Sequence, residues 1–77
     1  MTFGEKMVGL SFNPSGDDAV AQCKTAFAKQ IDGMDDLRKR PGASFDQVNI
    51  AHEAILKMMD AQMWAVKALT WKDETLA

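Results

Sequence analysis

Few side chains in this 77-residue chain could do chemistry, and they are scattered. Cys23 is the only cysteine and His52 the only histidine, whereas a structural zinc site needs a cluster of about four ligands. His52-Glu53 opens like the helical zinc-protease motif, but Leu56 occupies the position where that motif needs its second histidine. We therefore expect neither a metal site nor another cofactor.

The sequence does not bring a nucleophile and a base together either. Cys23 falls on the apolar side of a predicted helix, where a buried thiol stays un-ionised and inert, and the only imidazole belongs to another predicted helix. Asp35 and Asp36 are adjacent, so on a helix they point about 100° apart and do not converge like catalytic carboxylates. We expect them to be solvated, and we predict that the protein is not an enzyme.

The segment Phe12-Asn13-Pro14-Ser15-Gly16 is the best candidate for a binding site. One interpretation is a turn that leads into a helix, in which Pro14 fixes φ, Gly16 relaxes it and Ser15 caps the helix. The other is a binding corner, where an aromatic ring, an amide side chain and free backbone N–H groups lie beside a helix N-terminus that favours anions. Such a corner could stack a base and hold a phosphate.

The charged residues near this segment differ in whether they favour binding of an anion. Lys24 lies two turns into the first predicted helix, off its apolar stripe, and its stem is long enough to reach back to the corner, although most such lysines are simply solvated. Asp17 and Asp18 disfavour simple anion binding, but carboxylates can also accept hydrogen bonds from base N–H or ribose O–H groups. The residues alone predict a polar pocket and leave its ligand open.

The elements that would position these residues are a short N-terminal arm and a first long helix. Residues 1–16 contain three glycines and a proline without a helical period, which predicts an arm. Ser15 and Asp18 form a capping-box-like pair, so the helix should begin near Asp17, and Pro41-Gly42 should end it near residue 40. Its apolar stripe comprises Val20, Cys23, Phe27, Ile31, Met34 and Leu37.

A second helix of roughly 28 residues follows, because Ser44 and Gln47 form another capping-box pattern and no proline or glycine occurs after Gly42. The short connection predicts an antiparallel two-helix hairpin domain over residues 17–77. The second helix has two apolar stripes: Val48, Ala51, Ile55, Met58, Met59, Met63, Val66 and Leu69 form one, and Trp64, Ala68 and Trp71 the other. One partner helix cannot cover both, so this all-α chain should be a homo-oligomer.

Composition narrows the class of partner. The net charge is −2 and the pI is near 5.1, which disfavours DNA and RNA because nucleic-acid-binding domains usually carry a basic footprint. No apolar run approaches the ~20 residues of a membrane helix, so we expect neither a membrane span nor a signal peptide. A lone thiol fits a reducing compartment, which predicts a cytoplasmic protein.

Two stretches together resemble a known family: residues 8–16, VGLSFNPSG, and residues 61–68, AQMWAVKA. Their order and separation in a short chain are similar to those of the bacteriophage anti-CBASS cyclic-nucleotide sponge family, which shares a small helical-hairpin domain with the phage anti-Thoeris sponges. The likeness covers most of residues 8–72. It implies a helical hairpin that assembles into a ring-like homohexamer, with ligands between protomers, in the cytoplasm of an infected bacterium.

The resemblance also implies a function and a set of binding residues. Members of the family bind cyclic di- and trinucleotides without cleaving them and thereby block CBASS immune signalling. An N-terminal aromatic residue, usually tyrosine, stacks on a base, and a basic residue on the following helix contacts the phosphates; by position these roles fall on Phe12 and Lys24. Phe12 lacks the tyrosine hydroxyl, but stacking needs only the face of the ring.

The sequence leaves a function of another class open. In that alternative the chain is a helical protein–protein interaction module, whose apolar faces bind a host or phage protein and whose arm only caps a helix. The sequence indicates neither which cyclic nucleotide is preferred nor whether a separate trinucleotide site or a site for anti-Thoeris ligands is present.

Overall fold

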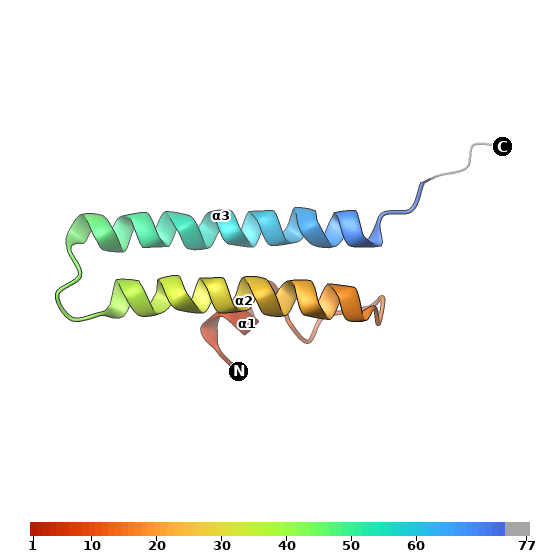
Figure 1. Ribbon diagram of the computed structural model, residues 1–77, viewed down its shortest axis with the longest axis horizontal. Coiled ribbons are helices and arrows are strands. Elements are labelled where there is room, and N and C mark those ends of the chain that lie inside the picture. Colours follow the sequence, from red (N-terminus) through yellow and green to blue (C-terminus); the bar gives the residue numbers. More distant parts are fainter. Residues whose placement is uncertain (74–77) are drawn as a thin grey trace.

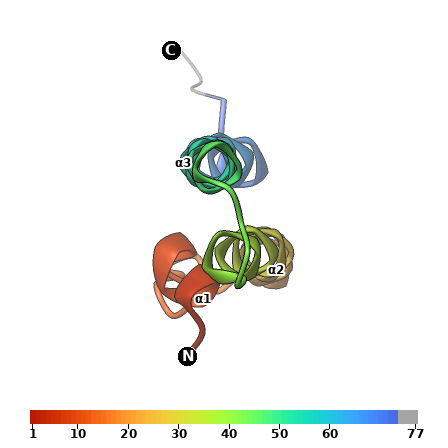
Figure 2. The ribbon, with the colours of Figure 1, turned by 90° about the vertical axis from the view of Figure 1, so that its left-hand side faces the viewer.

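The computed structural model describes residues 1–73, which form three helices and contain no strand (Figure 1). A short helix, α1 (Phe3–Val8), precedes two long ones, α2 (Asp18–Lys39) and α3 (Phe45–Thr70). The long helices lie side by side as an antiparallel hairpin, and α1 packs against α2 (Figures 1 and 2). The predicted all-α hairpin is therefore confirmed, with one helix more than the sequence analysis expected.

The prediction of an N-terminal arm without helix is wrong over Phe3–Val8. Thr2 and Glu5 form a reciprocal capping box: the Glu5 N–H donates to the Thr2 hydroxyl (3.1 Å) and the Thr2 N–H donates to the Glu5 carboxylate (2.8 Å). Gly9 ends the helix in the left-handed conformation, with φ 63°. The helix persists, although it is short, because its apolar residues pack against α2, with Val8 in the buried core.

The ends of the long helices lie close to their predicted positions. The Ser44 hydroxyl accepts a hydrogen bond from the Gln47 N–H (3.0 Å), which confirms the second cap. Arg40 leaves α2 with extended backbone immediately before Pro41, as the residue before a proline prefers. The predicted Ser15–Asp18 capping pair is wrong, because Gly16 turns the chain between Ser15 and the helix, and the side chain of Asp17 caps α2 by accepting from the Ala19 N–H (2.8 Å).

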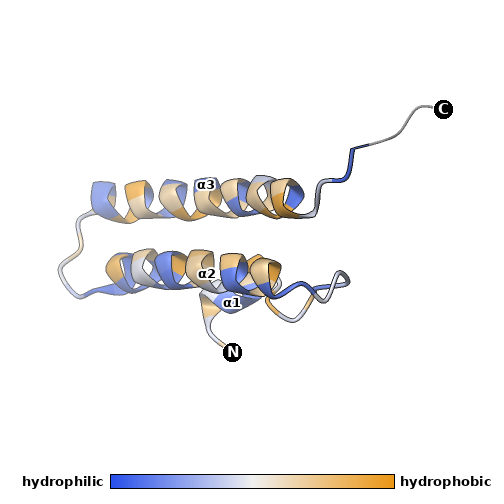
Figure 3. Cartoon of the chain, turned by 45° about the vertical axis from the view of Figure 1, so that its right-hand side comes forward, coloured by the Kyte–Doolittle hydropathy of each residue, from blue (hydrophilic) through white to orange (hydrophobic). Residues whose placement is uncertain are grey.

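The core lies where the three helices meet. Apolar and hydrophilic residues alternate along both long helices (Figure 3), and the buried cluster comprises Val8, Ala28, Ile31 and Ile55. Of the predicted stripe on α2, Val20 and Ile31 are buried, whereas Cys23, Phe27, Met34 and Leu37 are half-buried. Within residues 1–73, no helix combines the length and the apolar character that crossing a membrane requires.

Helix α1 approaches α2 so closely that only glycine fits at position 4. A Cβ at Gly4 would overlap the carbonyl oxygen of Ala28 and lie 2.8 Å from its carbonyl carbon. The Gly4 N–H donates to the Asp32 carboxylate at 2.6 Å, which anchors the first turn of α1 on α2. The absence of a side chain at this position therefore permits the docking of the N-terminal segment.

We predict that Gly4→Ala lowers the free energy of unfolding by about 1–3 kcal/mol, because the added methyl group forces α1 away from α2. Gly33→Ala is the matched control: this glycine also lies in a helix, nothing lies within 4 Å of its missing Cβ, and the change should stabilise by about 0.5–1 kcal/mol. Urea unfolding of both variants measures the difference. A Gly4→Ala protein as stable as the wild type would contradict this docking.

Candidate functional site

Five of the six predicted site residues line one surface hollow. The hollow has a volume of about 240 Å³ and lies where the N-terminal segment, the start of α2 and the end of α3 meet. The start of α2 and the end of α3 lie at the same end of the hairpin, away from the α2–α3 loop (Figure 1). The lining residues are Phe12, Asn13, Pro14, Ser15, Val20, Lys24, Val66 and Thr70. We refer to this hollow as the arm corner.

The segment between Phe12 and α2 is a tight polar turn, as the first of its two interpretations predicted, except that Asp17 and not Ser15 caps the helix. The Ser15 hydroxyl donates to the Asn13 side-chain oxygen (2.7 Å) and accepts from the Asp17 N–H (3.1 Å). The Asn13 amide donates to the Asp17 carbonyl (3.0 Å), and Gly16 takes the positive φ of 65° that closes the turn. Gly16 does not line the arm corner, so its role is to shape the turn.

Phe12 stands at the rim of the arm corner. Its side chain is 72% exposed, and it is absent from the apolar groups that surround the core. An exposed aromatic ring beside a hollow offers a face for stacking. The position of Phe12 therefore leaves open the second interpretation of the segment, a binding corner.

Lys24 is buried beside Phe12. Only 5% of the residue is exposed, and its ammonium donates to the Gly9 carbonyl (3.0 Å) and to the Phe12 carbonyl. The ammonium also lies 5.6 Å from the centre of the Phe12 ring. The predicted reach of Lys24 back to the corner agrees with these contacts, whereas its burial was not anticipated.

The charge of Lys24 has no acidic partner among residues 1–73. The two ion pairs found there involve other residues, so this ammonium is stabilised by two carbonyl dipoles and the Phe12 ring. A buried cation is normally paired with an anion, because taking a charge out of water costs several kcal/mol. Lys24 therefore brings a positive charge to the lining of the arm corner, which favours an anionic group nearby.

No binding role was predicted for the α3 side of the arm corner. Val66 and Thr70 line the hollow, and Val66 belongs to the stretch 61–68 that suggested the family resemblance. The two stretches that carry the resemblance therefore meet in space, although roughly fifty residues separate them in the chain. In the sequence, the resemblance at residues 61–68 was the available signal that a third element belongs to the site.

The outer face of α3 carries a second group of exposed residues. Trp64 and Trp71 are 64% and 62% exposed, which agrees with the predicted second apolar stripe, and Met63 is similarly exposed. The Lys67 ammonium lies 5.2 Å from the Trp64 ring and 5.8 Å from the Trp71 ring. We call Met63, Trp64, Lys67 and Trp71 the tryptophan face. Large exposed apolar groups of this kind usually belong to an interface.

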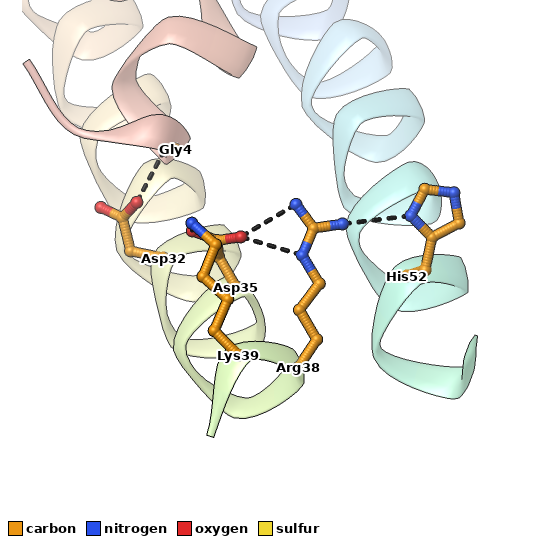
Figure 4. Close-up of polar contacts among 6 residues, drawn as sticks. All are labelled: Gly4, Asp32, Asp35, Arg38, Lys39 and His52. Atoms are coloured by element: carbon orange, nitrogen blue, oxygen red, sulfur yellow. Dashed lines mark hydrogen bonds and ion pairs between the residues drawn. The ribbon is translucent and has the colours of Figure 1, made fainter. Parts of the chain in front are cut away.

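A cluster of charged residues joins α2 to α3 at the other end of the hairpin (Figure 4). The expectation that Asp35 is solvated is wrong: it is 5% exposed, and its carboxylate binds Arg38 and Lys39, each at 2.8 Å. It is buried because it faces the same side of α2 as the docked N-terminal segment, and two cations compensate its charge. Asp36 is exposed, as predicted.

His52 is exposed at the edge of this cluster, and an Arg38 N–H group lies 3.2 Å from its Nδ1 atom. Arginine can only donate, so the His52 Nδ1 atom accepts this bond. The contact joins α2 to α3. Residues 1–73 hold no group of three or more His, Cys, Asp or Glu side chains that could bind a metal ion.

Comparisons with known proteins identify no relative of this chain: no protein-family model, curated protein or solved structure matches it.

We predict that Asp35→Asn weakens the acid dependence of stability. The hydrogen bond from Lys39 lowers the pKa of the Asp35 carboxyl, with a further contribution from Arg38, and burial opposes them. The folded-state pKa of Asp35 therefore lies below the unfolded value of about 3.9, so the ionised carboxylate stabilises the folded state. This stabilisation is complete above the unfolded pKa and is lost as the pH falls through the lowered pKa. Between about pH 5 and pH 2 the melting temperature should therefore fall less in Asp35→Asn than in the wild type. Asp36→Asn, at an exposed position, should retain the wild-type slope; equal slopes in all three proteins would contradict the prediction.

Proposed function

We propose that this protein binds a cyclic oligonucleotide signal, a cyclic dinucleotide or trinucleotide, and holds it without cleaving it, so that CBASS signalling is blocked. The observation that supports this best is the meeting of residues 8–16 with the end of α3 around a hollow. The hollow is lined by an exposed aromatic ring and by a buried lysine whose ammonium has no acidic partner among residues 1–73.

The chemistry of the arm corner suits a nucleotide better than a purely apolar ligand. The face of Phe12 can stack on a base, and the positive charge of Lys24 favours a phosphate nearby. Asp17 and Asp18 lie just beyond the corner, where their carboxylates can accept hydrogen bonds from base N–H or ribose O–H groups. A ligand that combines flat rings, hydroxyl groups and phosphates fits this set of groups.

We propose that a second copy of the chain completes the site. The hollow of about 240 Å³ lies below the ~300–1,000 Å³ of ordinary ligand pockets, so one protomer encloses only part of such a ligand. The tryptophan face supplies exposed apolar surface for assembly, and the family resemblance favours a homohexamer. In this mechanism the protein lowers the free concentration of the signal by stoichiometric capture, which needs affinity and abundance.

The second candidate function is a protein–protein interaction module. The tryptophan face favours it, because exposed tryptophans often contribute much of the binding energy of protein interfaces. In that case the arm corner would only cap α2, and a cyclic nucleotide would not affect the protein.

We predict that the protein is a homo-oligomer at micromolar concentration. Light scattering should give a mass several times the 8.5 kDa of one chain. Trp64→Ser should weaken assembly by roughly 30-fold or more, because an interface tryptophan often contributes over 2 kcal/mol. Gln30→Ser, at an exposed position of α2, is the control and should assemble normally. A stable, folded monomer of the wild-type chain would contradict both the assembly and the shared site.

We predict that a cyclic dinucleotide raises the melting temperature and is recovered intact. At 100 times its dissociation constant, a ligand adds about 2.7 kcal/mol to the stability of the native state. Phe12→Ala should weaken binding ~5- to 150-fold through lost stacking, whereas Phe12→Tyr, which keeps the ring face, should bind like the wild type. Thermal shift over a panel of cyclic di- and trinucleotides, followed by calorimetric titration of the best ligand, measures both effects.

Two controls accompany that measurement. Linear dinucleotides of the same bases test whether the closed ring is recognised, and chromatography of the heat-released ligand tests whether it has been cleaved. Linear products that increase with protein concentration would contradict the proposed sequestration. No stabilisation by any member of the panel would favour the interaction module instead.

A further inference from the structure

Lys24 fastens the N-terminal segment to α2 just before the turn into the helix. The Gly9 carbonyl accepts hydrogen bonds from both the Phe12 N–H (2.9 Å) and the Lys24 ammonium (3.0 Å). The same ammonium binds the Phe12 carbonyl. The turn from Gly9 to Phe12 is therefore closed by one backbone hydrogen bond and held against α2 by the buried Lys24 side chain.

The Phe12 ring receives little other support. The side chain is largely exposed and does not belong to the group packed around the core. The next polar contacts along the chain, among Asn13, Ser15 and Asp17, hold the turn that follows and do not involve the ring. The ring is consequently held through Lys24, which binds the backbone beneath it and places its ammonium 5.6 Å from the ring centre.

We propose that Lys24 is a positioning residue, which fixes the Phe12 ring at the mouth of the arm corner before any ligand arrives. The inference rests on the proposed cyclic-nucleotide function and adds an order of dependence to it: stacking on Phe12 requires the Lys24 anchor. Charge-assisted hydrogen bonds to backbone carbonyls are strong enough for this role, since each is worth more than a neutral hydrogen bond. Preorganising the ring also reduces the entropy lost when a ligand binds.

The first test uses the protein without ligand. Lys24→Met keeps an unbranched apolar stem and removes the ammonium, so hydrogen exchange at the Phe12 N–H should accelerate by about tenfold or more, while the centres of α2 and α3 keep their protection. Lys24→Arg, which can still donate to both carbonyls, should restore much of the protection. Lys29→Met removes an exposed charge from the same helix and is the matched control. Unchanged protection at Phe12 in Lys24→Met would overturn the proposal.

The second test asks whether Lys24 acts through Phe12. The affinity for the best cyclic dinucleotide is measured in the wild type, Phe12→Ala, Lys24→Met and the double variant. In the wild-type background Phe12→Ala should cost ~5- to 150-fold; in the Lys24→Met background it should cost less than about twofold, because the ring is no longer held in place. A residue that merely supports the fold, or that only contacts a phosphate, would leave the cost of Phe12→Ala the same in both backgrounds, and that result would overturn the proposal.

Failure of the proposed function is distinguishable from failure of this inference. If the wild type binds no cyclic nucleotide, the sequestration proposal fails, and the exchange experiment still decides whether Lys24 holds the Phe12 backbone. If Lys24→Met does not fold, Lys24→Arg and the exchange rate of the Phe12 N–H in the wild type take its place, because the anchor requires protection of that amide. Rapid exchange of the Phe12 N–H in the folded wild type would then overturn it.

Discussion

The close approach of α1 to α2 at Gly4 determines where the rest of the N-terminal segment can lie. Because a backbone meets a backbone there, the first turn of α1 can reach the Asp32 carboxylate, and Val8 enters the core one turn later. Gly9 then turns the chain so that its carbonyl and that of Phe12 come to the Lys24 ammonium. The arm corner follows from this docking, so we expect a change at Gly4 to affect a site beyond its own contacts.

The hydrophobic core is small. Within residues 1–73 its buried apolar residues are Val8, Val20, Ala28, Ile31, Ala51 and Ile55, and two of these six are alanines. A chain of this size buries little surface and gains correspondingly little stability from its core. The tryptophan face points away from that core and adds nothing to it in a single chain. A second copy of the chain packed on the tryptophan face would bury more apolar surface, which is the physical reason for proposing self-association.

The sequence predicted the long helices well and the N-terminal segment badly. In both cases the length of the helix decides the outcome, because it sets how often the periodic signal repeats. Periodicity and the Pro41-Gly42 break identify a long amphipathic helix, because many residues repeat the signal. Helix α1 is too short for periodicity, and only its ends marked it: Thr2 and Glu5 as a capping box, and Gly9 as the stop. Those signals were present in the sequence and outweighed the glycines that suggested an irregular arm.

For the candidate site, the sequence predicted the corner around Phe12 and the reach of Lys24, but not what buries the lysine. An apolar stripe on α2 was predicted, and part of it packs on α3. The helix buries a further side that includes Lys24, Ala28 and Asp35, which the N-terminal segment covers. A search for apolar residues overlooks a buried face that carries charged residues. The backbone carbonyls and neighbouring ions that allow those residues to be buried are visible only in the folded structure.

The two buried charges on that face differ in how they are compensated. Asp35 is neutralised by two cations of its own helix, so its bonding capacity is used within the protein. Lys24 binds two neutral carbonyls, and its charge remains unbalanced by any carboxylate in residues 1–73. A phosphate near Lys24 would supply the missing charge, while the carbonyl bonds already hold the lysine in place. The same side chain can therefore hold the Phe12 turn and make the hollow beside it favourable for an anion. No other buried group in residues 1–73 has both properties.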